Sequence, residues 1–341
     1  MIIPFYYFFF TIGITGISEY FFRDNIYQNN FKSKYPIPIL PITTFLFLLI
    51  YCSLSNLILL LPLLIRYLGL SNQIVNNSTN YFQYIVNFSS TFVVIYGIVK
   101  SFKIIKKIKI NTIFNNSKDL INNVHIPLLI SFLIYYLLAP KNPNLIMFDT
   151  GYYHYPAIKF LSKFGIETGI GSFFFGYGIY NLQFFGQLPF HNIFSNLGYI
   201  SPSINIIFLA TYIWFFIAEY FTFKNNKEIF YLNIPYKDIV ILYFVISCLF
   251  CSSSFISTIA SYSANIPIFI CGSISFYIIF SSTILGKRYF NLISIILLTI
   301  FAPLLKTSAI TICLLNTTYL IFYNLKILKK DTQNISNVFR K

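Results

Sequence analysis

Residues 43–65 read TTFLFLLIYCSLSNLILLLPLLI and contain no charged side chain. A helix needs about 20 mainly apolar residues to cross the hydrocarbon core of a bilayer, so this stretch is long enough for one crossing. Similar runs recur along the 341 residues, of which 57% are hydrophobic and only 10% charged. This composition is typical of a polytopic membrane protein and lies outside the range of soluble globular domains.

The apolar runs predict an all-α fold with about nine transmembrane helices. The tract 239–285 is too long for one helix and carries SYSAN near its middle, so we divide it between two spans. The other predicted spans are residues 2–17, 43–65, 81–99, 125–138, 204–223, 289–302 and 308–323. We therefore expect a three-helix N-terminal segment in residues 1–120 and a membrane core in residues 121–341.

Basic clusters between the spans set the predicted orientation. The densest cluster, KSFKIIKKIKI at 100–110, is expected in the cytoplasm because cytoplasmic loops carry an excess of Lys and Arg. Alternation then places the N-terminus, the polar stretch 71–80 and the long loop 139–201 outside, and the basic C-terminal tail inside. The chain contains 24 Lys and Arg but only nine Asp and Glu, and the location of the basic residues in cytoplasmic loops explains this excess. We therefore expect no nucleic-acid partner.

The outer loop 139–201 is far longer than an ordinary connection and is expected to be ordered and functional. Its segment YYHYPAIKFLSKFGI, 152–166, predicts an amphipathic helix lying in the membrane interface, with Pro156 in the first turn. The expected apolar face comprises Tyr155, Ile158, Phe160, Leu161 and Phe164. The Gly-rich stretch GIGSFFFGYG, 169–178, suits a re-entrant or interfacial turn.

The segment FDTGYYHYPAIKF, 148–160, contains Asp149, His154 and Lys159 close together in an otherwise strongly hydrophobic chain. Asp149 at the lip of a membrane cavity can act as a general base or bind a divalent cation such as Mg²⁺ or Mn²⁺. His154 could share that metal or hold a substrate oxygen, and Lys159 could face a lipid phosphate. The structural alternative makes Asp149 a helix cap, His154 an exposed interface residue and Lys159 a snorkelling side chain.

The segment FDTGYYHYPAIKFLSKFGIETGIGS, 148–172, resembles a family of bacterial multi-spanning proteins with an Asp-Thr-Gly-x-Tyr-His motif, which look like relatives of the GT-C glycosyltransferases. The resemblance implies a GT-C-like core whose donor is a sugar on a polyprenyl phosphate. It assigns Asp149 as catalytic base or metal ligand, with Tyr153, His154 and Lys159 at the substrate. We also expect Asn181, just after the Gly-aromatic stretch, to bind substrate.

A downstream stretch, APLLKTSAIT at 302–311, resembles a Lys-Leu-Ser-Ala segment of the same family. It implies that Lys306 lies at the outer interface and pairs with the lipid-linked phosphate. Snorkelling from a helix end is the alternative explanation for Lys306.

The expected function is an integral membrane glycosyltransferase of the bacterial cytoplasmic membrane. It would transfer a sugar from a lipid-phosphate-linked donor to an envelope glycan or lipid acceptor, in contact with membrane lipids. The alternative is a transporter or a non-catalytic membrane component of envelope polysaccharide assembly. A transporter should carry ionisable residues at mid-membrane or broken helices in symmetric halves.

Overall fold

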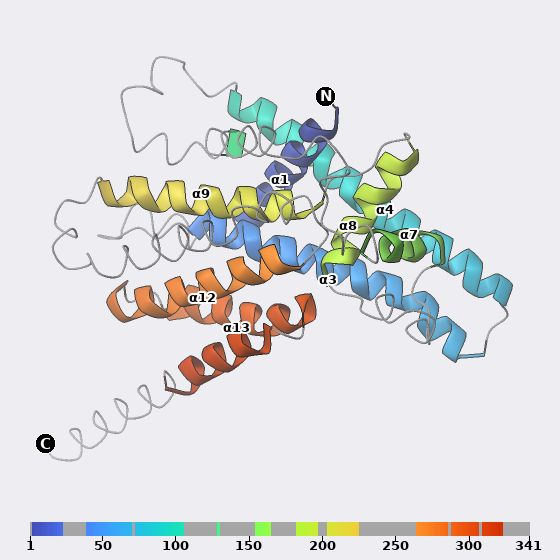
Figure 1. Ribbon diagram of the computed structural model, residues 1–341. Helices are drawn as coiled ribbons and strands as arrows, with labels where there is room; N and C mark the ends of the chain where they lie inside the picture. The colour runs from blue at the N-terminus through green and yellow to red at the C-terminus, as the bar shows by residue number, and fades with distance from the viewer. Residues whose placement is uncertain are drawn as a thin grey trace, which may run out of the picture. The chain divides into compact units, whose positions relative to one another are not determined.

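The computed structural model describes residues 2–22, 39–69, 72–105, 128–129, 154–164, 182–196, 203–224, 264–285, 288–306 and 309–322 (Figure 1). Every regular element in these ranges is a helix, which confirms the predicted all-α class. The chain divides into two compact units, Met1–Ile270 and Cys271–Lys341. The domain boundary expected near residue 120 falls outside the described ranges.

Most of the described helices coincide with predicted apolar runs. The helices are α1 (Ile2–Phe21), α3 (Ile39–Tyr67), α4 (Asn72–Ile105), α7 (Tyr155–Phe164), α8 (Leu182–Asn196), α9 (Asn205–Lys224), α12 (Asn265–Leu285) and α13 (Arg288–Leu305), followed by a helix at Ile310–Phe322. Of the predicted spans, 125–138 is described only at 128–129, and the first half of 239–285 lies outside the described residues.

Two helices in the described part of the chain are long and apolar enough to cross a membrane, Ile39–Tyr67 and Ser78–Lys103. Four further apolar helices are shorter in their described extent: Asn205–Ala218, Asn265–Ile279, Phe290–Leu305 and Ile310–Phe322. The structure therefore supports two candidate spans, and the predicted total of about nine stays a prediction.

The directions of α1, α3 and α4 alternate. Phe10 of α1 packs on Tyr51 of α3 with ring centroids 5.1 Å apart, while Thr15, further along α1, contacts Thr44, earlier in α3, so these two helices run antiparallel. Tyr6 and Ser90 are hydrogen-bonded at 3.1 Å and Glu19 pairs with Lys100, so α1 and α4 run in the same direction. This is the order of directions expected for three successive crossings.

Glycines bring the backbones of α1 and α4 into contact. A Cβ atom added at Gly13 would lie under 3.0 Å from the Val93 carbonyl oxygen, and one added at Gly97 would collide in the same way with the Phe9 carbonyl oxygen. Small residues at a helix crossing allow this close approach and are typical of helix pairs in membranes. The α1–α4 contact therefore depends on both glycines.

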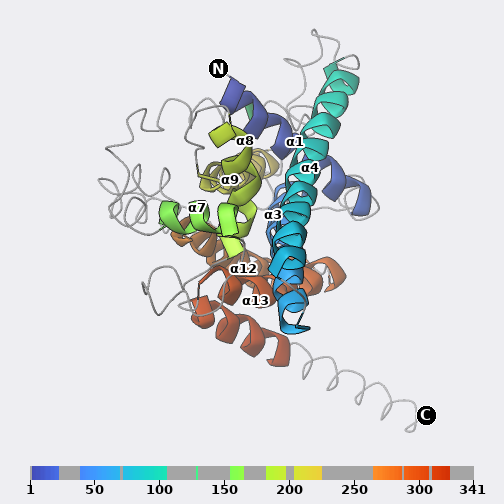
Figure 2. The same cartoon turned by 90° about the vertical axis from the view of Figure 1, so that its right-hand side faces the viewer.

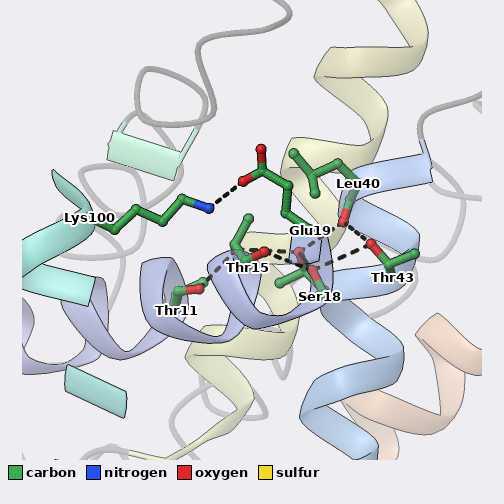
Figure 3. A network of polar contacts seen from close by, with 8 residues as sticks. Thr11, Thr15, Ser18, Glu19, Leu40, Thr43 and Lys100 are labelled. Atoms are coloured by element: carbon green, nitrogen blue, oxygen red, sulfur yellow. Dashed lines mark hydrogen bonds and ion pairs between the residues drawn. The ribbon is translucent and has the colours of Figure 1, made fainter. Parts of the chain in front are cut away.

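Buried hydroxyls form a seam between α1 and α3 (Figure 3). Thr11 and Thr15 each donate to the carbonyl one turn earlier in α1, at 2.8 Å. Across the helices, the Thr44 hydroxyl donates to Thr15 Oγ1 at 3.3 Å, and Thr43 reaches Ser18 Oγ at 3.5 Å. Hydroxyls satisfied in this way can be buried at little cost.

The connection between α3 and α4 is shorter than the predicted polar loop 71–80. Gly69, with φ of 76°, ends α3 in the left-handed conformation, and its N–H donates to the Arg66 carbonyl at 3.0 Å. Helix α4 then begins at Asn72. Polar residues can be part of a helix because its backbone carbonyls pair within the helix whatever the side chains are, and the first N–H groups can bind water or side chains.

In the second unit, polar contacts link the three helical segments. The Cys313 thiol donates to the Thr299 carbonyl at 3.1 Å, and the Asn316 amide donates to Ser275 Oγ at 3.1 Å. These contacts tie the last described helix to α13 and α12.

Candidate functional site

Helix α7 forms where the amphipathic pattern predicted it, with Pro156 in its first turn. Ala157, Ile158 and Leu161 are buried and lie on one helical face. They pack with Leu59 of α3, Val86 of α4 and the α8 residues Phe184, Phe185 and Leu188. The predicted apolar face is thus divided, because part of it is covered by protein while Phe164 remains 46% exposed.

Helix α8 was not predicted from the sequence. Its residues from Phe184 to Asn192 are all buried, including the polar side chains of Gln187, His191 and Asn192. A helix covered on all sides shows no apolar stripe, so the usual periodicity signal is absent. The recurrence of polar residues every four positions, at Gln187, His191 and Ser195, was the available signal.

A relay of side chains joins α7, α8 and α4. The Ser162 hydroxyl donates to Asn192 Oδ1 at 2.6 Å, and Asn192 Nδ2 donates to Asn87 Oδ1 at 3.1 Å. A second contact runs from Gln83 Nε2 to the Leu161 carbonyl at 3.2 Å. Because these bonds join three helices that are far apart in the chain, they fix the position of α7 along α4.

The beginning of α9 is held by α8. Gln187 Oε1 accepts a hydrogen bond from the Ile204 N–H at 2.5 Å, and Ser203 Oγ accepts one from the Asn205 N–H at 3.2 Å. The N–H groups that start a helix have no partner within it, so this buried carboxamide and hydroxyl satisfy them. Helix α8 is therefore bonded both to α7 and to the entry of α9.

His154 is buried, with 7% of its surface exposed, at the start of α7. Its ring meets Phe184 edge to face, with centroids 5.5 Å apart. The alternative that made His154 an exposed interface residue is therefore wrong, because α8 covers the ring.

His191 is also buried, with 4% exposed, and its ring lies 5.4 Å from that of Tyr155. Burial lowers the pKa of His191, and the nearby positive charge of Lys159 lowers the pKa further. His191 is therefore neutral at neutral pH, with one ring nitrogen able to accept a proton. Phe184 and His191 are seven residues apart on α8, so the two ring contacts, His154 with Phe184 and His191 with Tyr155, involve α8 residues roughly 10 Å apart along that helix.

The other predicted site residues are distributed unevenly. Lys159 is exposed on α7 and close enough to His191 to influence its charge. Asp149, Tyr153 and Asn181 lie outside the described residues. Lys306 belongs to the second unit, where it is exposed directly after α13 and its carbonyl accepts from the Ala309 N–H at 3.0 Å. The structure thus places Lys159 near His191, and it places His154 in the same pair of helices, α7 and α8.

A metal site is not formed by the residues that the structure describes, since they contain no group of three His, Cys, Asp or Glu able to hold an ion. Of the proposed pair of ligands, only His154 is among them. Binding of Mg²⁺ or Mn²⁺ by Asp149 and His154 stays a prediction.

Comparison with known proteins identifies a family to which the chain belongs. A family model described as a domain of unknown function (DUF8201) matches residues 65–339. The chain belongs to this family. The DUF8201 region contains α4, α7, α8 and α9, and therefore both histidines and the relay that positions α7. No curated protein and no solved structure matches the chain.

Proposed function

We propose that this DUF8201 protein is an integral membrane glycosyltransferase related to the GT-C class. It transfers a sugar from a polyprenyl-phosphate-linked donor to an envelope glycan or lipid acceptor. The proposal starts from the resemblance of residues 148–172 to GT-C relatives. The observation that supports it best is that His154 of this motif is buried at the α7–α8 contact, in the same helix pair as the neutral His191.

A membrane location is supported by the surface of α4. Exposed apolar side chains recur every three or four residues from one end of the candidate span to the other, at Tyr81, Tyr84, Phe88, Phe92, Ile95, Val99 and Phe102. At 1.5 Å per residue this stripe is about 32 Å long, close to the thickness of about 30 Å of a hydrocarbon core. An exposed apolar stripe of this length is unfavourable in water and suits lipid.

In the proposed reaction the acceptor hydroxyl oxygen bonds to the anomeric carbon of the donor sugar. Its proton passes to the Asp149 carboxylate, and the polyprenyl phosphate leaves with the electron pair of the broken bond. His154 orients a substrate oxygen, with Tyr153 and Asn181 also at the substrate. The resemblance alone assigns Lys306 to the phosphate oxygens, where a cation lowers the free energy of the developing charge.

A divalent cation, if bound by Asp149 and His154, would supply positive charge to the leaving phosphate. A carboxylate is a preferred ligand of Mg²⁺, whereas an imidazole suits softer ions. The carboxylate of Asp149 would suit either Mg²⁺ or Mn²⁺, and the imidazole of His154 would be the less favourable ligand of the two for Mg²⁺.

The experiment compares envelope glycan composition by mass spectrometry in cells that carry the wild-type protein, Asp149→Asn, or a deletion. Asp119→Asn, which makes the same chemical change in the predicted cytoplasmic loop, is the matched control. We expect Asp149→Asn at normal abundance to remove the same sugar as the deletion and Asp119→Asn to remove none. A glycan that changes on deletion but not with Asp149→Asn would refute the catalytic role.

A glycan that changes on deletion but not with Asp149→Asn would support the alternative, a transporter or non-catalytic component of envelope polysaccharide assembly. The described helices α1, α3 and α4 favour the enzyme over a transporter. Their ionisable Glu, Lys and Arg residues lie in the last two turns of each helix, at Glu19, Arg66, Lys100 and Lys103. Ion-coupled transporters carry such groups at mid-membrane.

A further inference from the structure

We propose that the outer face of α7 binds the anionic headgroups of the surrounding phospholipids. We define this face by Lys159, Phe160, Lys163 and Phe164. The proposal rests on the membrane location included in the proposed function, but it does not depend on the transfer reaction.

The outer face combines two cations with two aromatic rings. Lys159 and Lys163 are exposed and one helical turn apart. The rings of Phe160 and Phe164 pack with centroids 4.7 Å apart, and Lys163 Nζ lies 5.2 Å from the centre of the Phe164 ring. No acidic residue occurs in α7 to neutralise the two lysines within the helix. The face therefore presents positive charge and apolar surface side by side.

The hydrogen bonds of α7 set its level along α4. Gln83 bonds to the Leu161 carbonyl, and Asn87 is joined to Ser162 through Asn192. The exposed apolar stripe of α4 begins at Tyr81, and residues 83 and 87 lie two and six residues after it, towards the middle of the stripe. At 1.5 Å per residue, α7 lies about 3–9 Å inside the Tyr81 end of the stripe. Amphipathic interfacial helices lie at this depth, about 5–10 Å into the boundary between headgroups and acyl chains.

The direction of α7 fits the same location. Figure 2 shows α7 running across α3 and α4 rather than along them. Because α3 and α4 are the candidate spans, the axis of α7 would lie in the membrane plane. Its inner face is occupied by α8, α3 and α4, so the outer face is the one that meets lipid.

The chemistry of this face selects a phospholipid over a free anion. A free phosphate would satisfy the lysines but would leave Phe164 in water, whereas a phospholipid offers a phosphate and acyl chains at adjacent depths. A Lys near an anionic membrane surface contributes about 1 kcal/mol, which is about fivefold in binding. We therefore expect anionic lipid to be enriched about fivefold or more at this face over zwitterionic lipid.

Tryptophan quenching by brominated lipids tests the proposal. The natural Trp214 is buried, so Trp214→Phe provides the background and Phe164→Trp places a reporter on the outer face. The protein is reconstituted into mixed phosphatidylcholine and phosphatidylglycerol vesicles in which one lipid or the other carries bromine on its acyl chains. The two lipids are present at equal mole fraction. We expect brominated phosphatidylglycerol to quench the fluorescence of the reporter more strongly than brominated phosphatidylcholine does, as fivefold enrichment of phosphatidylglycerol at this face predicts. Lys159→Gln with Lys163→Gln should abolish the difference.

A second reporter, Phe88→Trp on the exposed stripe of α4, separates the two hypotheses. We expect both lipids to quench it, and to quench it equally. Quenching of Phe88→Trp without quenching of Phe164→Trp would overturn the α7 inference while leaving the membrane location intact. Absence of quenching at both positions would overturn the membrane location itself. Equal quenching of Phe164→Trp by the two lipids would overturn the selectivity for anionic headgroups.

Discussion

The seam between α1 and α3 consists of buried polar side chains and the relay between α7, α8 and α4 of buried and partly buried ones, and the two satisfy their hydrogen bonds differently. In the seam, Thr11 and Thr15 donate to carbonyls of their own helix. In the relay, Ser162, Asn192 and Asn87 depend on one another across three helices. A bond within a helix survives small shifts of that helix, whereas the relay requires α7 to stay in one position. We infer that the seam supports the fold and that the relay positions the candidate site.

The largest expected effect comes from the backbone contact beside the seam. Gly97→Ala should destabilise the protein by several kcal/mol, because the new Cβ would collide with the Phe9 carbonyl oxygen and two packed helices must separate. Thermal unfolding in detergent measures this change. Gly272→Ala is the matched control, since its Cβ would lie 3.5 Å from Ile312 Cδ1, an ordinary contact. Similar unfolding temperatures for the two variants would contradict the close α1–α4 approach.

Breaking the relay is expected to have the next largest effect. Asn192→Leu leaves the partly buried polar groups of Ser162 and Asn87 without this partner, which costs about 1–3 kcal/mol for each group that water cannot reach. Amide hydrogen exchange should show the loss of protection mainly in α7, because α7 is the helix that the relay holds. Uniform loss of protection across α1, α3 and α7 would contradict a local positioning role.

The protonation of His191 makes the stability of the folded protein depend on pH, whereas the hydroxyls of the seam do not titrate. The pKa of His191 is lowered in the folded protein by burial and by Lys159, so the unfolded chain binds the proton more readily. Stability should be unaffected above the unfolded pKa of about 6.5 and should fall as the pH drops from there through the folded pKa. Unfolding temperatures measured between neutral and mildly acidic pH test this expectation.

Two variants separate the causes of that pH dependence. His191→Gln should flatten the acid limb attributable to this residue, and Lys159→Gln should reduce it only in part, because burial is the larger cause. An acid limb that is identical in His191→Gln and wild type would show that other groups produce it.

The smallest expected effect is in the seam itself. Thr44→Val removes the hydroxyl whose single proton is shared between the Leu40 carbonyl at 2.8 Å and Thr15 Oγ1 at 3.3 Å, while keeping the shape of the side chain. Hydrogen bonds between membrane helices contribute about 0.6 kcal/mol on average, so we expect a loss of that size. Chemical denaturation can resolve it. A loss as large as that of Asn192→Leu would remove the distinction between seam and relay.

Much of the helical layout was predictable because apolar runs of about 20 residues leave few alternatives. An amphipathic pattern predicted α7, whose exposed lysines alternate with apolar positions. Helix α8 was missed because burial on every side removes that alternation, and His154 was placed at the surface in one alternative because α8 was absent from it. The partners of Ser162 and Asn192 were not predictable, since they depend on contacts between segments far apart in the chain.

The contact between α1 and α4 also has a consequence for how the chain assembles during synthesis. Tyr6 and Ser90, which meet in this contact, are 84 residues apart, and α3 lies between them. At translation rates of about 5–20 residues per second, the surface of α1 around Gly13 that contacts α4 remains uncovered for about 4–17 s after it has been made. Helix α1 must therefore be shielded during that interval, by lipid or by the insertion machinery, until its partner arrives.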